Sequence, residues 1–346
     1  MATKIPLLFK KTYQCILACS FILLPVIFNS CELPSREKTN IASANAYLAD
    51  TTAVANEEYV MITAAVNLPL YVNHEQTAFK NWGKQMGVPV SVLGNDEWDV
   101  QKIVEIVEQV IQQRPSGLLI NGTDPGLATV INKAVDAGIP VVIYDSEIPG
   151  SHPNCFVGSD WYTMGYSQGE KVGKLINGKG KVACLGILGL QNQEDGFRGL
   201  QDALKKFPDI EFVGKYNDAA NLENAAKVTS DIISANPDIA AICGFTSATG
   251  PGIALAVKET GKAGKIKITC VDAEPEHISL IKEGVIQYSV GQKRDLFGSF
   301  GGQLLYNVVH KKASFSQNDR AAGVNPIPVH VNTGLIEIDS SNIQYF

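Results

Sequence analysis

The sequence predicts an α/β protein with two doubly wound lobes, each built on a mainly parallel sheet. First, the chain has 346 residues, which is too long for one ordinary domain and suits two. Second, short apolar runs alternate with amphipathic segments, as in parallel sheets that helices cover on both faces. Third, this alternation runs from residue 59 to residue 144 and restarts at residue 181, which indicates two such units.

The composition fits two folded lobes and excludes several other classes of protein. Hydrophobic residues make up 45% of the chain and charged residues 18%, which excludes disorder, collagen and coiled coil. The net charge is −6 and no segment carries a long run of Lys and Arg, so we expect no nucleic-acid partner. The seven cysteines follow neither a CxxC nor a Cys/His spacing, so we expect no metal site and no cofactor.

Residues 1–30 have the layout of an export signal. Lys4, Lys10 and Lys11 precede an almost wholly apolar run over residues 13–28, and Cys31 follows. The apolar run is about 16 residues long, which is short for a membrane span that needs about 20. Two interpretations stay open: a plain signal peptide, or a lipoprotein signal that leaves Cys31 acylated. Either one predicts a periplasmic or cell-envelope protein, and the second predicts a lipid anchor on Cys31.

Residues 31–58 are rich in Ser, Thr, Asn and Ala and show little periodicity. This composition is typical of a flexible tether. A tether of this kind would let a folded domain diffuse close to a membrane to which Cys31 is anchored.

The elements of the first lobe follow from the hydrophobic pattern. Strands are expected at residues 59–66, 88–93, 117–120 and 140–144, and helices at 77–86, 100–113 and 126–137. The helix over 100–113 is the clearest, because Ile103, Val107 and Val110 fall on one broad apolar face. In the second lobe, strands are expected at residues 181–188, around Val213, and at 239–243, 266–271 and 285–290.

Polar side chains follow many of these strands, and ligands of open α/β sheets bind beyond the carboxyl ends of the strands. Together they are amides, hydroxyls, carboxylates and one aromatic ring, which suit a small, neutral ligand rich in hydroxyl groups. Singly, each could be only a turn former or a helix cap, so the prediction depends on the set. The candidates are Asn67, Leu70, Tyr71, Asn121 and Asp145 in the first lobe, and Gln193, Thr246, Ser247, Asp272 and Gln292 in the second.

From Tyr59 to its end, the chain resembles the ribose/galactose class of periplasmic sugar-binding proteins, the solute receptors of ABC importers. The resemblance depends on the order and spacing of several motifs, among them residues 138–145, 157–160, 271–276 and 281–284. It implies two Rossmann-like lobes joined by a hinge of three crossings, which we expect near residues 158–160, 291–293 and 324–327. Lobe 1 would then comprise residues 59–159 and 293–325, and lobe 2 residues 160–292 and 326–346.

The resemblance also implies a function. The lobes would close on a small sugar, and the closed form would deliver it to the permease of an ABC importer. An alternative partner is a chemoreceptor or a sensor kinase, and we expect the protein itself to be a monomer. The sugar contacts carried over from the family fall on Asn67, Leu70, Tyr71, Asn121, Asp145, Asp272 and Gln292.

The chain departs from the family pattern at three places. The family usually has an arginine about where Gly196 stands, many members have Asn-Asp where this chain has Thr246-Ser247, and Trp161 replaces an asparagine. Loss of the arginine puts ribose itself in doubt as the ligand. Trp161 could stack on a ligand or pack in the core or at the hinge.

One motif suggests an enzyme. Gly165-Tyr-Ser167-Gln-Gly169 matches the nucleophile elbow of serine esterases, which requires a strand that runs straight into the serine. We instead expect Ser167 inside a helix that starts after Ser159 or Asp160, so no enzyme activity is expected. Cys184, Cys243 and Cys270 fall in expected strands, where buried free thiols are favoured and a disulfide stays open.

Overall fold

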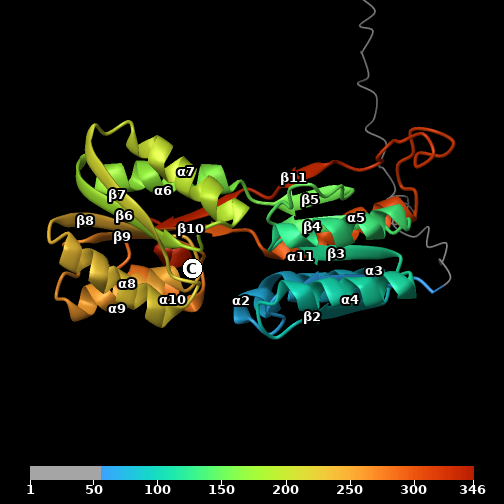
Figure 1. Cartoon of the computed structure of the whole chain (residues 1–346), viewed down its shortest axis with the longest axis horizontal. Coiled ribbons are helices and arrows are strands. Elements are labelled where there is room, and N and C mark those ends of the chain that lie inside the picture. Colours follow the sequence, from blue (N-terminus) through green and yellow to red (C-terminus); the bar gives the residue numbers. More distant parts are fainter. Residues whose placement is uncertain (1–55) are drawn as a thin grey trace, which may run out of the picture. The chain divides into compact units, whose positions relative to one another are not determined.

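The computed structural model describes residues 56–346, which form two six-stranded sheets with helices packed on them (Figure 1). The expected export signal, Cys31 and the expected tether up to residue 55 lie outside the described residues. Of the helices in residues 56–346, none is long and apolar enough to cross a membrane.

The first sheet has the strand order β11-β5-β4-β3-β1-β2, and all of its strand pairs are parallel. Its strands are β1 (Tyr59–Thr63), β2 (Val90–Gly94), β3 (Gly117–Asn121), β4 (Val141–Asp145), β5 (Cys155–Gly158) and β11 (His330–Asn332). Its helical segments are α2 (Pro69–Tyr71), η1 (Val72–Gln76), α3 (Thr77–Met86), α4 (Val100–Gln113), η2 (Pro125–Leu127), α5 (Ala128–Asp136) and α11 (Asp295–Val309).

Helix α4 shows how the apolar pattern positions an element. Asp99 caps its first turn by accepting hydrogen bonds from two backbone N–H groups. Ile103, Val107 and Val110 are buried against the side chains of β1 and β3, in one of the two cores of this lobe. Because both faces of the sheet are covered, its strands are apolar without alternation.

The second sheet has the order β12-β10-β9-β8-β6-β7, in which only β12 runs antiparallel to its neighbour. Its strands are β6 (Lys179–Gly186), β7 (Asp209–Asn217), β8 (Ile239–Gly244), β9 (Lys267–Val271), β10 (Tyr288–Gln292) and β12 (Leu335–Asp339). Its helical segments are α6 (Trp161–Leu175), α7 (Gln191–Leu204), α8 (Leu222–Ala235), α9 (Thr249–Glu259), α10 (Pro275–Lys282) and η3 (Ile343–Tyr345). The expectation of an α/β fold with two doubly wound lobes is confirmed.

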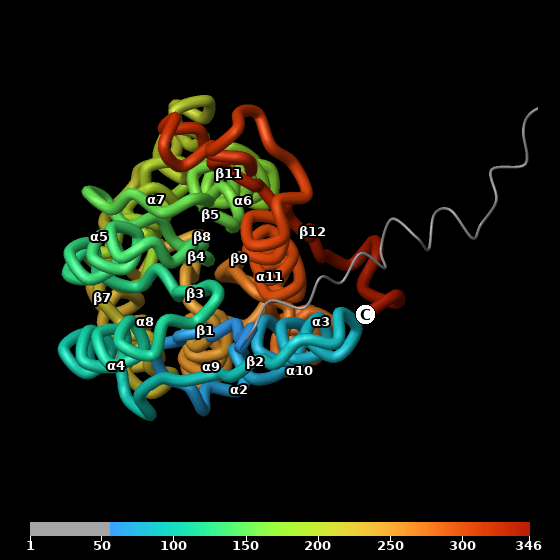
Figure 2. Tube along the Cα trace, turned by 90° about the vertical axis from the view of Figure 1, so that its right-hand side faces the viewer, coloured from blue at the N-terminus to red at the C-terminus, as the bar shows by residue number. Residues whose placement is uncertain are grey.

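Helix α11 comes late in the chain but packs in the first lobe, beside α3 (Figure 2). The indole N–H of Trp82 on α3 donates to Gln303 on α11 at 3.3 Å. A Cβ atom at Gly298 would lie 2.1 Å from the carbonyl oxygen of Glu75, so only glycine allows this close approach of α11 to η1.

The chain passes between the two sheets three times: from β5 to α6, from β10 to α11, and from β11 to β12. The expected position of the third crossing, at residues 324–327, is wrong. Residues 330–332 form β11, which pairs with β5 in the first sheet, so the crossing lies at Thr333 and Gly334. The boundary expected at 325/326 is therefore too early, because β11 is a three-residue strand without an apolar run.

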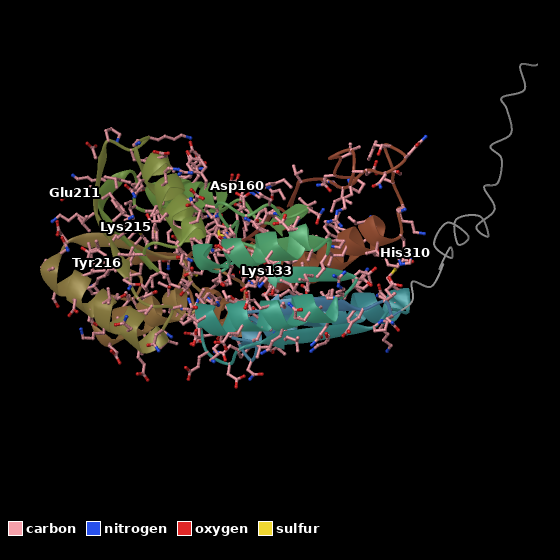
Figure 3. The ribbon with its side chains drawn as sticks, turned by 45° about the vertical axis from the view of Figure 1, so that its right-hand side comes forward. Lys133, Asp160, Glu211, Lys215, Tyr216 and His310 are labelled. Carbon is pink, nitrogen blue, oxygen red and sulfur yellow. The ribbon has the colours of Figure 1, made fainter. Side chains whose placement is uncertain are left out.

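The position of Ser167 within helix α6 decides whether the G-x-S-x-G motif can be a nucleophile elbow. Asp160, labelled in Figure 3, caps α6 by accepting a hydrogen bond from the N–H of Thr163 at 2.9 Å. Ser167 lies in the middle of α6, with no strand running into it, so it is not the serine of a nucleophile elbow. The glycine that opens the motif serves packing instead: a Cβ at Gly165 would lie 1.8 Å from the carbonyl oxygen of Gly196 on α7.

The four cysteines among residues 56–346 are free and buried. They are Cys155, Cys184, Cys243 and Cys270. Burial raises the pKa of the Cys243 and Cys270 thiols to about 12, so both are protonated at neutral pH. The disulfide that the sequence left open is therefore not formed, and these side chains pack as small apolar groups.

The expected tether ends earlier than residue 58. Glu57 accepts a hydrogen bond from the hydroxyl of Tyr59 at 2.6 Å and lies 2.7 Å from the imidazole of His310. His310 follows the last residue of α11 and is labelled in Figure 3. The chain is thus already attached to the first lobe at Glu57.

Candidate functional site

A cleft of about 90 Å³ lies beyond the carboxyl ends of the strands, and residues of both lobes line it. The sequence-predicted candidates that line it are Leu70, Tyr71, Asp145, Gln193, Thr246, Ser247, Asp272 and Gln292. Residues separated by up to 222 positions thus meet in one place, as expected for the carboxyl edges of parallel sheets.

Asp145 and Asp272 occupy equivalent places in the two lobes. Asp145 ends β4, and Asp272 directly follows β9. Both have left-handed backbone angles, with φ of 77° and 73°, which Asp tolerates better than most residues. Both side chains are buried, at 7% and 6% exposure, although they line the cleft. A matched pair of buried carboxylates therefore serves the cleft, one from each sheet.

Arg294 holds the carboxylate of Asp145 in place. Its Nη2 lies 3.1 Å from Oδ2 of Asp145 and its Nη1 lies 3.4 Å from Oδ1. The other edge of the guanidinium donates to Glu75, through Nε at 3.0 Å and Nη2 at 2.6 Å. These contacts use four of the five guanidinium N–H groups and leave one, on Nη1, free to donate elsewhere. Burial raises the pKa of Glu75 to about 7, against the lowering effect of Arg294.

Sequence reasoning missed Arg294. It lies on the crossing from β10 to α11, just before the helix, where a basic residue in the sequence does not indicate a ligand site. Its guanidinium also lies over the ring of Tyr71, 5.2 Å from the centroid. The position where the family's arginine was expected is closed: a Cβ at Gly196 would lie 2.7 Å from the ring of Phe245. The cleft therefore has an arginine, but from a different element.

The carboxylate of Asp272 has no hydrogen-bond partner among residues 56–346. Burial raises its pKa to about 6, although the charge of Arg294 acts in the opposite direction. Another polar atom of this lobe at the cleft is in a similar state: within the described chain, Oε1 of Gln292 is buried without a partner. Because unsatisfied buried polar atoms are costly, this half of the site is prepared for a ligand that supplies hydrogen-bonding groups.

The remaining candidates differ in their roles. The amide of Gln193 donates to the carbonyl of Phe245 at 2.9 Å, so it ties the first turn of α7 to the loop that follows β8. The hydroxyl of Thr246 lies 2.6 Å from that of Thr249, whose hydroxyl in turn donates to Asp218. Ser247 lines the cleft in the same loop. These side chains fix the wall of the cleft.

Two candidates lie outside the cleft lining. Asn67 is exposed and donates to Asp96, because the chain turns into α2 and brings Leu70 and Tyr71 to the cleft instead. Asn121 ends β3 and is buried immediately before Gly122, which lines the cleft. The structure therefore does not bring Asn67 to the other candidates.

An ion pair joins the lobes at the rim of the cleft. Nε2 of His74, on η1, lies 2.9 Å from the carboxylate of Glu274, which precedes α10. Nδ1 of His74 faces Asp295 at 3.4 Å. The hydrogen bond to Glu274 raises the pKa of His74 to about 9, so the imidazole is charged at neutral pH.

Among residues 56–346, no group of three or more His, Cys, Asp or Glu side chains is arranged to hold a metal ion. What the cleft offers is hydrogen bonding: two buried carboxylates, amides, one guanidinium and the ring of Tyr71. Such a set binds hydroxyl groups and stacks on the apolar face of a ring.

Comparison with known proteins agrees with this geometry. The family described as "Periplasmic binding protein domain" matches residues 59–313. A D-allose-binding periplasmic protein of Escherichia coli is 25% identical over 74% of this chain and 85% of its own length. A ribose import binding protein of Bacillus subtilis is 24% identical over 72% of this chain and 80% of its own length.

Two solved structures extend the likeness to the whole fold. The sugar-binding protein of a sugar ABC transporter from Bacillus halodurans is 28% identical, with a TM-score of 0.78 over 84% of this chain and 100% of its own. An arabinose-binding protein from Geobacillus stearothermophilus is 29% identical, with a TM-score of 0.74 over 84% of this chain and 99% of its own. The chain therefore belongs to the periplasmic binding protein family and has the type I fold of that family, two lobes joined by three crossings.

Proposed function

We propose that this protein is an exported solute-binding protein that captures a sugar in the cleft between its lobes and delivers it to an ABC importer. The observation that carries the proposal is the pair of buried carboxylates, Asp145 and Asp272, that line one cleft from opposite lobes. It is a binding protein and not an enzyme, as the sugar-binding relatives support.

The chemistry of the pair favours a neutral polyhydroxyl ligand. A carboxylate is an acceptor only, so it binds the hydroxyl groups that a sugar presents around its ring. Charge-assisted hydrogen bonds of this kind contribute about 1.5–3 kcal/mol each. In the cleft Arg294 pairs with two carboxylates, those of Glu75 and Asp145, and the charge of Asp272 acts on it as a third, which disfavours an anionic ligand.

The two halves of the site differ in how far they are organised before binding. In the first lobe, Asp145 is oriented by Arg294 and lies near Tyr71. In the second lobe, Asp272 and Gln292 offer acceptor atoms without partners in the described chain. A sugar that binds to the first half would supply hydroxyl groups to the second, so its contacts with both lobes favour the closed form.

A thermal-shift screen of the purified protein tests this proposal, with pentoses, hexoses, polyols, amino acids and nucleosides. A sugar at about 100 times its dissociation constant stabilises the folded form by about 2.7 kcal/mol. We expect a rise in melting temperature with at least one sugar and none with amino acids or nucleosides. A shift with another class of ligand and none with any sugar would refute the sugar assignment.

The partners and location belong to the same proposal. The closed form would dock on the membrane permease of the importer as a monomer. The alternative receiver that the sequence left open, a chemoreceptor or sensor kinase, has no observation in its favour here. The apolar run before Cys31 supports export, and a lipid on Cys31 would keep the protein at the membrane. Mass spectrometry of the mature N-terminus tests the acylation: an unmodified N-terminus at another residue would refute it.

A further inference from the structure

A second cavity adjoins the cleft and is larger, at about 290 Å³ against about 90 Å³. The two cavities share three lining residues, Asp145, Trp161 and Asn192, so they meet along a common wall. The second cavity lies at the hinge: Ser159 and Asp160 line it where the chain first crosses between the sheets, and Asn332 lines it beside the third crossing. Of the ten candidate residues that the sequence predicts, Asp145 alone lines this second cavity.

Trp161 forms the shared wall between the two cavities. It is the first residue of α6 and is 8% exposed, and its indole N–H is buried without a partner in the described chain. An indole ring is the strongest stacking surface that a protein offers to the apolar face of a sugar ring. The indole packs in a core with Phe197 and Phe245 and also lines both cavities, so a ring on either side of this wall would have contact with it.

Helix α7 contributes polar side chains to the lining of the second cavity. Asp195 pairs with Arg198 at 2.8 Å and accepts a hydrogen bond from the amide of Gln191 at 3.1 Å. The guanidinium of Arg198 lies over the ring of Tyr162, 5.4 Å from its centroid. These side chains present donors and acceptors that a second hydroxyl-bearing ring can use.

The charges of the second cavity set the class of group that it admits. Glu147, Asp160 and Asp195 line it together with Arg198 and His330, and His330 pairs with Glu147. With Asp145, four carboxylates thus outnumber the two basic side chains, which disfavours a phosphate or a uronic acid. A neutral sugar ring, with hydroxyl groups that donate and accept, fits this lining.

We propose that the second cavity is a subsite for a second sugar ring, so that the ligand of this protein is a neutral disaccharide or glycoside rather than a free monosaccharide. This inference rests on the proposed function and names its ligand class. One ring occupies the cleft between Asp145 and Asp272, and the next extends past Trp161 toward Arg198.

Calorimetric titration with matched sugars tests the inference. The probes are galactose with melibiose and lactose, glucose with maltose and cellobiose, and xylose with xylobiose. We expect at least one disaccharide to bind about tenfold more tightly than either of its component sugars. Disaccharides that all bind equally or more weakly than their components would overturn the subsite, while monosaccharide binding would leave the proposed function intact. If no sugar of either kind binds, the proposed function fails and the subsite fails with it.

Variants on helix α7 locate the second ring. Arg198→Ala should weaken the disaccharide at least tenfold and the monosaccharide less than twofold. Lys205→Ala is the matched control, because Lys205 also pairs with an aspartate three residues earlier but lines neither cavity. Asp272→Asn should weaken both ligands, since it acts in the cleft itself. An equal effect of Arg198→Ala on both ligands would contradict the assignment.

Discussion

Replacing Asp272 with Asn should stabilise the unliganded protein while it weakens sugar binding. The buried carboxylate has no hydrogen-bond partner in residues 56–346, and its pKa rises from 3.8 to about 6 on folding. Because the folded pKa is the higher one, the folded form retains a proton that the unfolded chain has lost, and stability falls as pH rises through 4 to 6. The shift of about two pKa units corresponds to about 3 kcal/mol above pH 7.

The asparagine carries no charge, so Asp272→Asn removes this cost at pH 8 and changes little at pH 4, where the aspartate is already protonated. The amide still needs hydrogen bonds, so we expect a net gain of about 1–3 kcal/mol at pH 8. Backbone strain should not change, since Asn tolerates the left-handed conformation at this position as Asp does. Loss of charge-assisted bonds to sugar hydroxyls should weaken binding about 10- to 100-fold.

The matched control is Asp145→Asn, the same substitution in the equivalent position of the other lobe. Asp145 is paired with Arg294, and removing one partner of a buried ion pair costs about 3–5 kcal/mol. Scanning calorimetry of both variants without sugar, at pH 8 and pH 4, should therefore give shifts of opposite sign at pH 8. If Asp272→Asn lowers the melting temperature at pH 8 as Asp145→Asn does, the reasoning about the unpartnered carboxylate is refuted.

Three further outcomes follow from the site and the packing around it. His74 loses its proton as pH rises through about 9, so the pair with Glu274 that joins the lobes is complete below pH 6.5 and lost above pH 9. Between pH 7.5 and pH 10, sugar affinity measured by calorimetry should therefore fall several-fold more in the wild type than in His74→Ala. Equal falls in the two proteins would contradict a role of this pair in closure of the lobes. Arg294→Met leaves Glu75 and Asp145 buried without a cation, so denaturant unfolding at pH 8 should show a free energy of unfolding that is lower by about 3 kcal/mol or more. An unchanged unfolding midpoint would show that the ion pairs of Arg294 do not stabilise the fold. Gly196→Ala places a methyl group 2.7 Å from the ring of Phe245, so its melting temperature should drop by several degrees, whereas Gly189→Ala, in an open turn, should cost only the strain of its positive φ. Equal effects of the two substitutions would show that α7 is not closely packed against Phe245.

Much of the fold could be predicted because the apolar runs carry it. Helices α3 and α4 have the bounds that the pattern predicts, since their buried faces repeat with the period of a helix. The short strand β11 could not be found, because its three residues are partly exposed and its place depends on pairing with β5. One missed strand was enough to misplace the third crossing.

The residues of the site could likewise be predicted only in part from the sequence. Asp145 and Asp272 could be identified, since each stands at the end of an apolar strand where ligands of open sheets bind. Arg294 could not, because its partner Glu75 lies 219 residues away and only the packing of α11 on the first lobe brings them together. Asn67 looked equivalent to the other candidates, but the local turn into α2 directs it to Asp96.

A crystal structure of the protein with the sugar that stabilises it most would test the central assignment most directly. We expect hydroxyl groups of one sugar ring within hydrogen-bond distance of the carboxylates of both Asp145 and Asp272, with Gln292 as a further partner. Electron density for the sugar outside this cleft, or contacts with only one of the two carboxylates, would contradict the account of capture between the lobes.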